Sequence, residues 1–187
     1  MEKKTLKLAK LVEPCQRNWQ DDFIVPKEDQ EYICNVATRM PTKQNKPSYD
    51  LYCITDKDII QRVFEVAYNP NDIDFTYLKN PQAKANCLLI WTFNYCRESE
   101  ADVNINIGIS AGAAAIAAAE LGYKTGFCKC FVVTELQQIL DSNSPALILG
   151  FGKPDTRFTR IDRVENDKKI GEKASKGQKN VSVYYID

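Results

Sequence analysis

Apolar residues recur at helical spacing in two segments near the start of the chain. Between residues 5 and 12 they fall on one face of a short helix. A second helix is expected from 26 to about 39, because a proline and two acidic residues at its start are typical of a helix N-terminus. Apolar residues at helical spacing follow. We therefore expect two amphipathic helices before the first strand.

Continuous apolar runs rich in β-prone residues predict strands at 49–55, 86–93 and 145–152. Helices are expected at 56–68, where an acidic residue caps the start, and at 134–141. Helices and strands do not alternate strictly, which indicates an α+β (mixed α/β) fold rather than a doubly wound one.

The end of the chain combines a polar segment with a strand pattern. Residues 162–180 are lysine-rich and polar, which is typical of an arm on a surface, whereas 181–187 ("VSVYYID") favour a strand. An arm that ends in a strand favours pairing with a sheet edge, including one on another subunit. The length and apolar content fit one domain over residues 1–187, with 162–187 as its C-terminal extension.

The segment 105–122 ("INIGISAGAAAIAAAELG") is a helix of small residues. Polar residues interrupt it and alanine is weakly apolar, so we do not interpret it as a membrane span. Gly108 and Gly112, four residues apart, would let another backbone come close. A central core helix and a helix that pairs with its own copy in a dimer both fit this pattern, and periodicity does not choose between them.

Charge and composition limit the kinds of binding and catalysis that this chain can carry out. Lysine plus arginine equals aspartate plus glutamate, at 25 each, so the chain lacks the basic footprint of a nucleic-acid binder. The N-terminus has no apolar stretch typical of a secretion signal, which makes a cytoplasmic protein the default expectation. The chain has no histidine, which excludes imidazole-dependent triads and histidine-ligated zinc. Chemistry must come from other side chains or from a cofactor.

Seven cysteines are scattered along the chain, and we interpret most of them as small buried apolar residues. Two of them, Cys128 and Cys130, lie one residue apart in "GFCKCF". A zinc site would need four ligands, and a chelating pair usually has at least two intervening residues, so a metal site is disfavoured. A redox switch remains an alternative.

Three segments gather amide and cationic side chains after predicted elements: 15–20, 40–49 and 150–160. Such donors suit an anionic ligand that carries a phosphate. The sequence contains neither a Walker loop nor "GxGxxG", so the common nucleotide-binding loops are unsupported.

The order of these segments resembles the nitroreductase superfamily of FMN-dependent flavoproteins. "QRNWQ" stands where that family has "RRSxR", and "PTKQNKP" stands where it has "PSxxNxQP". "AAAELGYKT" matches a small-residue helix that ends in "LGLGT", and "LILGFGKP" matches a strand that ends in "GxP". Between them, "GFCKCF" matches a loop that passes over the flavin. The resemblance implies a central mixed sheet flanked by helices, with a C-terminal strand that extends to the partner subunit.

The resemblance also implies a set of cofactor-binding residues. Residues 16–20 would contact the FMN phosphate, ribityl chain and pyrimidine edge, and residues 42–45 would reach flavin bound mainly by the other subunit. Residues 128–130 would offer a backbone N–H to flavin N5. The late arginines would lie near the phosphate. Glutamines replace two family cations at positions 16 and 20, so phosphate charge compensation rests on the arginines. The implied residues are Gln16, Arg17, Asn18, Gln20, Thr42, Lys43, Asn45, Cys128, Lys129, Cys130, Arg157 and Arg160.

The function implied by the resemblance is an FMN-dependent oxidoreductase that uses NAD(P)H to reduce electron-poor small molecules such as nitroaromatics or quinones. The flavin would perform the chemistry, so no protein side chain is assigned as catalytic. A homodimer is expected, without nucleic-acid, membrane or metal binding. A flavin-destroying or dehalogenating relative on the same fold and a non-catalytic flavin-binding protein remain as alternatives.

Overall fold

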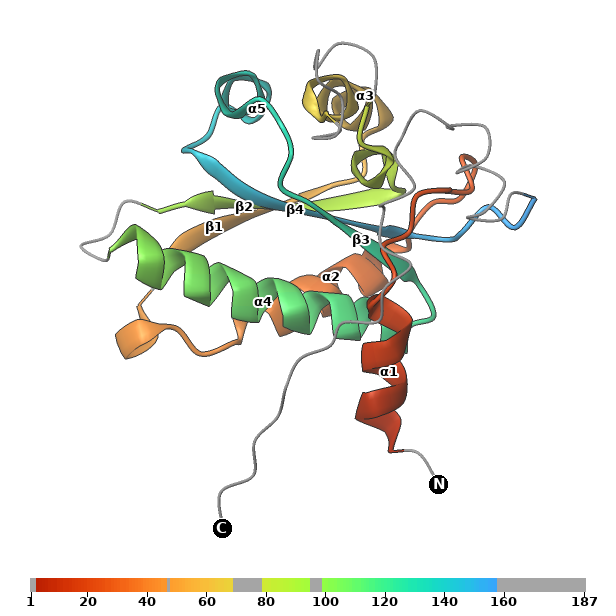
Figure 1. Cartoon of the computed structure of the whole chain (residues 1–187), viewed down its shortest axis with the longest axis horizontal. Coiled ribbons are helices and arrows are strands. Elements are labelled where there is room, and N and C mark those ends of the chain that lie inside the picture. Colours follow the sequence, from red (N-terminus) through yellow and green to blue (C-terminus); the bar gives the residue numbers. More distant parts are fainter. Residues whose placement is uncertain (1–2, 47, 69–78, 95–98, 158–187) are drawn as a thin grey trace, which may run out of the picture.

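The computed structural model describes residues 3–46, 48–68, 79–94 and 99–157. In these ranges four strands form one sheet in the order β1-β2-β4-β3, and all three pairings are antiparallel (Figure 1). The expected mixed sheet is therefore not seen among the described strands. The reason is that direction depends on the connections, whereas the apolar run of β2 shows only that both of its faces are buried. The strands are β1 (Tyr49–Ile54), β2 (Cys87–Phe93), β3 (Lys124–Cys128) and β4 (Pro145–Gly152).

Helices cover both faces of the sheet, which confirms the α+β class (Figure 1). In the figure, α2 and α4 lie on one face, and α3 and α5 lie on the other. Two short 3-10 turns accompany them. The helical elements are α1 (Lys4–Val12), α2 (Lys27–Thr38), η1 (Lys43–Asn45), α3 (Lys57–Val66), η2 (Pro81–Lys84), α4 (Glu100–Glu120) and α5 (Val133–Leu140).

The core consists of two apolar clusters, one on each face of the sheet. Side chains alternate across a strand, so Leu89 and Trp91 of β2 join the cluster under α2 and α4, whereas Leu88 and Ile90 join the one under α3 and α5. All four are fully buried. Burial of each such side chain contributes about 1.5–3 kcal/mol, and β2 thus holds both layers together.

Helix α4 begins five residues earlier than the sequence analysis expects, at Glu100 rather than 105. Ser99 is the N-cap, and its hydroxyl accepts the backbone N–H of Asp102 at 3.2 Å. The sequence carries a signal for this start, because a serine followed three residues later by an acid is a capping pattern.

The polar residues of α4 hold other elements against it. Asn106 donates to Ser48 Oγ at 2.9 Å, and Ser110 donates to the carbonyl of Ala37 at 2.8 Å. Glu120 accepts the hydroxyl of Tyr32 at 2.8 Å. By length and composition alone α4 could cross a membrane, but half of that apolar window is buried inside the protein. These contacts are those of a core helix, with one face left open.

The C-terminal arm at 162–180, the predicted strand at 181–187 and Arg160 lie outside the described residues.

Candidate functional site

The segment 16–20 crosses the edge of the sheet next to β3 and β4. The Gln16 N–H donates to the Thr125 carbonyl at 2.7 Å, and the Gln20 N–H donates to the Lys153 carbonyl at 3.0 Å. Between them, the Asn18 carbonyl accepts the Asp155 N–H at 3.1 Å. These bonds join residues 16–20 to Thr125, directly before "GFCKCF", and to the residues after β4.

Gly126 of β3 makes this crossing possible. A Cβ at this position would lie 2.7 Å from the Gln16 carbonyl oxygen and 2.7 Å from Gln82 Cγ. Both distances are shorter than van der Waals contact allows, so any larger residue would push the segment away. The sequence motif "GFCKCF" therefore begins with a glycine that serves the packing of the predicted site.

Two side chains in the crossing segment have different roles. Arg17 is half-buried within this segment. The side-chain amide of Gln16 donates to the Asn18 carbonyl at 2.6 Å, which fixes the turn between them. Gln16 thus shapes the segment, while Arg17 brings its charge.

Arg157 is close to the site but is paired with an acid. Its Nε donates to Asp155 Oδ1 at 3.0 Å and its Nη2 to Oδ2 at 2.7 Å, so the contact is bidentate. The hydrogen bonds from Arg157 lower the pKa of Asp155 below its ordinary value. The Arg157 side chain is 77% exposed. Its charge is therefore largely compensated by Asp155, a partner that the sequence analysis did not identify.

The expected loop over the flavin is partly strand, because Lys124–Cys128 pairs with β4 as β3. Only Lys129 and Cys130 of the predicted trio follow the strand. The Cys130 carbonyl accepts the Tyr68 N–H at 3.0 Å, which ties this segment to the residues after α3. The backbone at 128–130 is thus fixed from both sides. Because β3 pairs with β4, the start of this segment has the fixed register of a strand and is not a free loop.

Cys128 is buried, and desolvation raises the pKa of its thiol to about 12. Such a thiol carries little thiolate at neutral pH, which disfavours a redox role for this sulfur. Cys130 is half-buried. Of the described cysteines only Cys87 and Cys128 are buried, so the interpretation of most cysteines as buried apolar residues is wrong. Periodicity could not show that Cys34 and Cys130 pack against the core while staying partly exposed.

Asn86 is a residue that the sequence analysis missed. Its Nδ2 donates to the carbonyls of Gln20, at 2.8 Å, and Phe23, at 3.1 Å, while its Oδ1 accepts the Lys153 N–H at 3.1 Å. It therefore joins the crossing segment to the end of β4. A single asparagine before a strand gives no sequence signal for this role.

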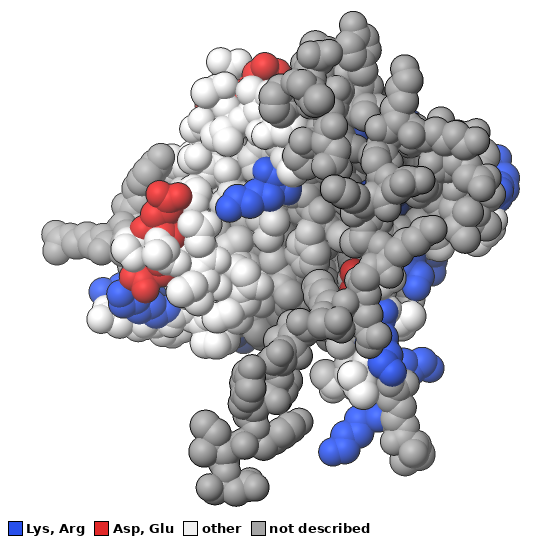
Figure 2. All heavy atoms as spheres, in the orientation of Figure 1, with Lys and Arg blue, Asp and Glu red and all other residues white. Residues whose placement is uncertain are grey.

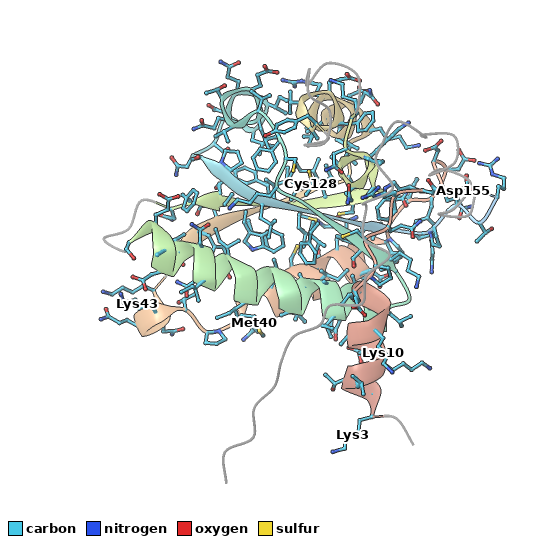
Figure 3. The ribbon with its side chains drawn as sticks, in the orientation of Figure 1. Lys3, Lys10, Met40, Lys43, Cys128 and Asp155 are labelled. Atoms are coloured by element: carbon cyan, nitrogen blue, oxygen red, sulfur yellow. The ribbon has the colours of Figure 1, made fainter. Side chains whose placement is uncertain are left out.

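The predicted residues Thr42, Lys43 and Asn45 lie at the opposite end of α4. Figure 3 shows Lys43 on one side of the molecule and Asp155 on the other. Lys43 Nζ lies 2.7 Å from Asp102 Oδ2, and its backbone N–H donates to Asn106 at 3.4 Å. Figure 2 shows acidic and basic side chains next to each other at this start of α4. Within one chain, residues 42–45 therefore lie apart from the predicted residues at 16–20 and 157.

The face of α4 between these two ends is open. Ile105 is 61% exposed and Ile109 is 42% exposed. Among the residues that the structure describes, a Cβ added to Gly108 or Gly112 would meet no atom within 4 Å. The helix that carries this apolar stripe is about 30 Å long at 1.5 Å per residue.

No protein-family model matches the chain, and no curated protein matches it by sequence. Solved structures do match it. A nitroreductase family protein from Clostridium novyi aligns with a TM-score of 0.70 at 13% identity, over 84% of this chain and 87% of that one. A nitroreductase family protein from Clostridium difficile aligns with a TM-score of 0.67 at 20% identity, over 94% and 99%.

A third structure, a protein from Staphylococcus epidermidis provisionally named NAD(P)H:FMN oxidoreductase, aligns with a TM-score of 0.67 at 16% identity, over 86% of this chain and 93% of that one. At these identities the likeness concerns the fold. The architecture expected from "QRNWQ", "PTKQNKP" and "LILGFGKP" is confirmed: the chain has a nitroreductase-like fold.

Proposed function

We propose that this protein is an FMN-dependent oxidoreductase that takes electrons from NAD(P)H and passes them to electron-poor small molecules, such as nitroaromatics or quinones. The observation that supports it most is the meeting of residues 16–20, the 125–126 part of β3 and residues 153–155 at one edge of the sheet, held by the hydrogen bonds of Gln16, Asn18 and Gln20. The nitroreductase-like fold supports the same function.

The donor set fits a flavin mononucleotide. Arg17 supplies a guanidinium, which binds phosphate with directed hydrogen bonds, and the amides of Asn18 and Gln20 can serve the polar chain and ring edge. Arg157 can add a second cation only by leaving Asp155. We therefore infer that Arg17 carries most of the phosphate recognition.

The site would be completed by a second copy of the chain. The residues around Lys43 stand beside the first turns of α4, whereas the crossing segment bonds to Thr125, just after its last turn. If two α4 helices pair antiparallel through the open stripe of Gly108 and Gly112, each η1 loop reaches the crossing segment of the partner. A homodimer with two composite sites follows from this arrangement.

When bound, FMN supplies the hydride and electron transfer. The chain would hold the phosphate with Arg17 and keep the backbone at Lys129 and Cys130 in a fixed position at the flavin ring. Tyr68 and the strand β3 anchor that backbone. Fixed N–H dipoles aimed at a group that gains negative charge contribute about 2.7–4 kcal/mol each in well-measured cases.

An absorption spectrum of the purified protein tests this proposal directly. We expect a yellow protein that releases FMN on denaturation and bleaches with NADH or NADPH in the absence of oxygen, followed by recovery when a quinone is added. A colourless protein that does not bind added FMN would refute the proposal. Bleaching without recovery by any acceptor would refute the enzymatic part alone.

A flavin-binding protein without turnover is the second candidate. It is favoured by the pairing of Arg157 with Asp155, together with glutamines at positions 16 and 20, because these features reduce the positive charge at the phosphate. Binding of FMN without bleaching by either pyridine nucleotide would support it.

A further inference from the structure

A cavity of about 250 Å³ opens between the start of α3, residues 21–24 and the residues that lead from η2 into β2. We call it the α3 cavity, and its lining residues come from 21–24, 55–61 and 84–86. Helix α3 covers the face of the sheet away from α4, so the cavity and the open stripe of α4 lie on different sides of the molecule (Figure 1). None of the described residues implied for cofactor binding lines it. The α3 cavity is therefore separate from the candidate flavin site.

The first turns of α3 form one side of the α3 cavity. Asp56 caps the helix, because its side chain accepts two backbone N–H groups of the first turn. Lys57, Ile60 and Gln61 follow at i, i+3 and i+4, a spacing that places them on one face of the helix. The cap fixes where the helix begins, and with it the position of these three side chains at the cavity.

Apolar side chains form the inner wall of the α3 cavity. Ile60 and Ala85 are buried, and Phe23 is half-buried against the core. Ile24 is 73% exposed, the largest value among the large apolar side chains that the structure describes. A ligand with an apolar chain would remove part of this surface from water, which favours its binding.

Most of the uncharged polar side chains at the α3 cavity already have partners. Asn86 uses both atoms of its amide within the protein, and Gln61 Nε2 donates to Glu65 Oε1 at 2.6 Å. Among the described residues this leaves the Thr55 hydroxyl and the lysines of the cavity to bind a polar group. The lining therefore suits a ligand that is polar at one end and apolar over the rest.

Two lysines from different elements stand at the α3 cavity. Lys57 Nζ donates to the backbone carbonyl of Asp21 at 3.4 Å, and Lys84 Nζ lies 5.9 Å from the centre of the Phe64 ring. In the described ranges neither lysine pairs with a carboxylate. Two lysines against the one lining carboxylate, that of Asp21, leave one net positive charge. This charge is complementary to a monoanion rather than to a dianion or a cation.

We propose that the α3 cavity binds a small carboxylate with an apolar chain. The carboxylate lies at Lys57 and Lys84, and the chain lies against Phe23, Ile24 and Ile60. Pockets for drug-sized molecules measure about 300–1,000 Å³, so a volume of about 250 Å³ suits a smaller molecule. This binding does not depend on the proposed flavin chemistry.

Hexanoate is the probe, and backbone amide NMR shifts of the isotope-labelled full chain report where it binds. We expect shifts within 55–61 and 84–86, with a Kd on the order of 0.1–1 mM because the lysines are exposed. Hexanamide, which lacks the charge, and acetate, which lacks the chain, should each bind at least about threefold more weakly. The titrations are run with and without FMN, and the same result is expected in both.

Charge variants test the lysines. Lys57→Gln and Lys84→Gln should each weaken hexanoate binding about two- to fivefold. Asp21→Asn should strengthen it by a similar factor, because the substitution removes a carboxylate that repels the ligand. Arg62→Gln on the same helix and Asp22→Asn next to Asp21 make the same changes of charge at exposed positions outside the lining. These two controls should leave hexanoate binding nearly unchanged.

Ile24→Ser removes part of the apolar wall and should weaken the binding of hexanoate more than that of acetate. The dispersion of the amide spectrum shows whether each variant is folded. The proposal is overturned by any of four results: no binding of hexanoate, equal binding of hexanamide, shifts confined to other residues, or equal losses in the lysine variants and Arg62→Gln. Because protein without FMN is titrated as well, such a result leaves the proposed flavin chemistry to its own test.

Discussion

The indole N–H of Trp91 donates to the hydroxyl of Ser110 at 2.9 Å, between β2 and α4. Ser110 in turn donates to the Ala37 carbonyl at 2.8 Å, so one hydroxyl links the sheet, α4 and the end of α2. Neither Trp91 nor Ser110 has any exposed surface. Each polar group therefore depends on the other for its hydrogen bond.

Substitution Ser110→Ala should lower the free energy of unfolding by about 1–3 kcal/mol, because the buried indole N–H would lose its acceptor. Urea unfolding followed by Trp fluorescence measures the change. Gln138→Ala at an exposed position on α5 is the control, with an expected change within about 0.5 kcal/mol. Equal stability of both variants would contradict the role assigned to Ser110.

Gly126→Ala should displace the crossing segment, since the added Cβ would lie 2.7 Å from the Gln16 carbonyl oxygen. We expect lower stability and at least tenfold weaker FMN binding, measured by urea unfolding and by fluorescence titration, where tenfold corresponds to about 1.4 kcal/mol. Gln138→Ala, at an exposed position on α5 across the sheet, is the control. If Gly126→Ala binds FMN as the wild type does, residues 16–20 do not contribute to FMN binding.

Breaking the ion pair between Asp155 and Arg157 should strengthen FMN binding, whereas the previous substitution should weaken it. Asp155→Asn should release the guanidinium and tighten FMN binding several-fold, whereas Arg17→Gln should weaken it about tenfold or more, since charge-assisted hydrogen bonds contribute about 1.5–3 kcal/mol. Isothermal titration measures both. Asp141→Asn is a control with the same change of charge, at a left-handed position that asparagine tolerates. Weaker FMN binding by Asp155→Asn would contradict this prediction and show that the intact Asp155–Arg157 pair supports the site.

The open stripe of α4 predicts a dimer that depends on small residues. Gly112→Arg should block close helix approach and yield a monomer in sedimentation velocity runs over a range of concentrations. Gln138→Arg, an exposed site on α5 across the sheet, should leave the dimer intact. A wild-type chain that sediments as a monomer at every concentration would exclude the composite site.

The Lys43 and Ser99 hydrogen bonds lower the pKa of Asp102 below its ordinary value of 3.8. A carboxyl with a lowered pKa stabilises the fold above its unfolded pKa, and this contribution is lost as the pH falls through the folded value. Wild-type protein should therefore lose more stability than Asp102→Asn between about pH 4 and pH 2, while the difference stays constant above about pH 5. Urea midpoints at several pH values measure it, with Asp22→Asn, an exposed carboxylate outside α4, as the control.

The pattern of apolar residues was sufficient to place most of the elements. Strand β4 has the predicted bounds, and Asp56 caps α3 as expected, because burial and capping are local properties of the sequence. The start of α4 was missed even though the Ser99 cap is visible in the sequence, because the polar residues around it also fit a connection. Direction and pairing of strands depend on contacts that no local pattern contains.

For the candidate site as well, some features could be predicted from the sequence and others depended on the tertiary structure. The sequence alone determined which segments carry donors, their order along the chain and the resemblance that orders them. Only the tertiary structure decided that residues 16–20 cross β3, that Asp155 holds Arg157, that Asn86 joins both sides, and that Lys43 stands at the far end of α4. It also showed that "GFCKCF" begins as a strand and that the thiols of Cys53 and Cys87 lie 3.6 Å apart. Side-chain types are written in the sequence, whereas distances between residues far apart in the chain arise from packing of the whole fold.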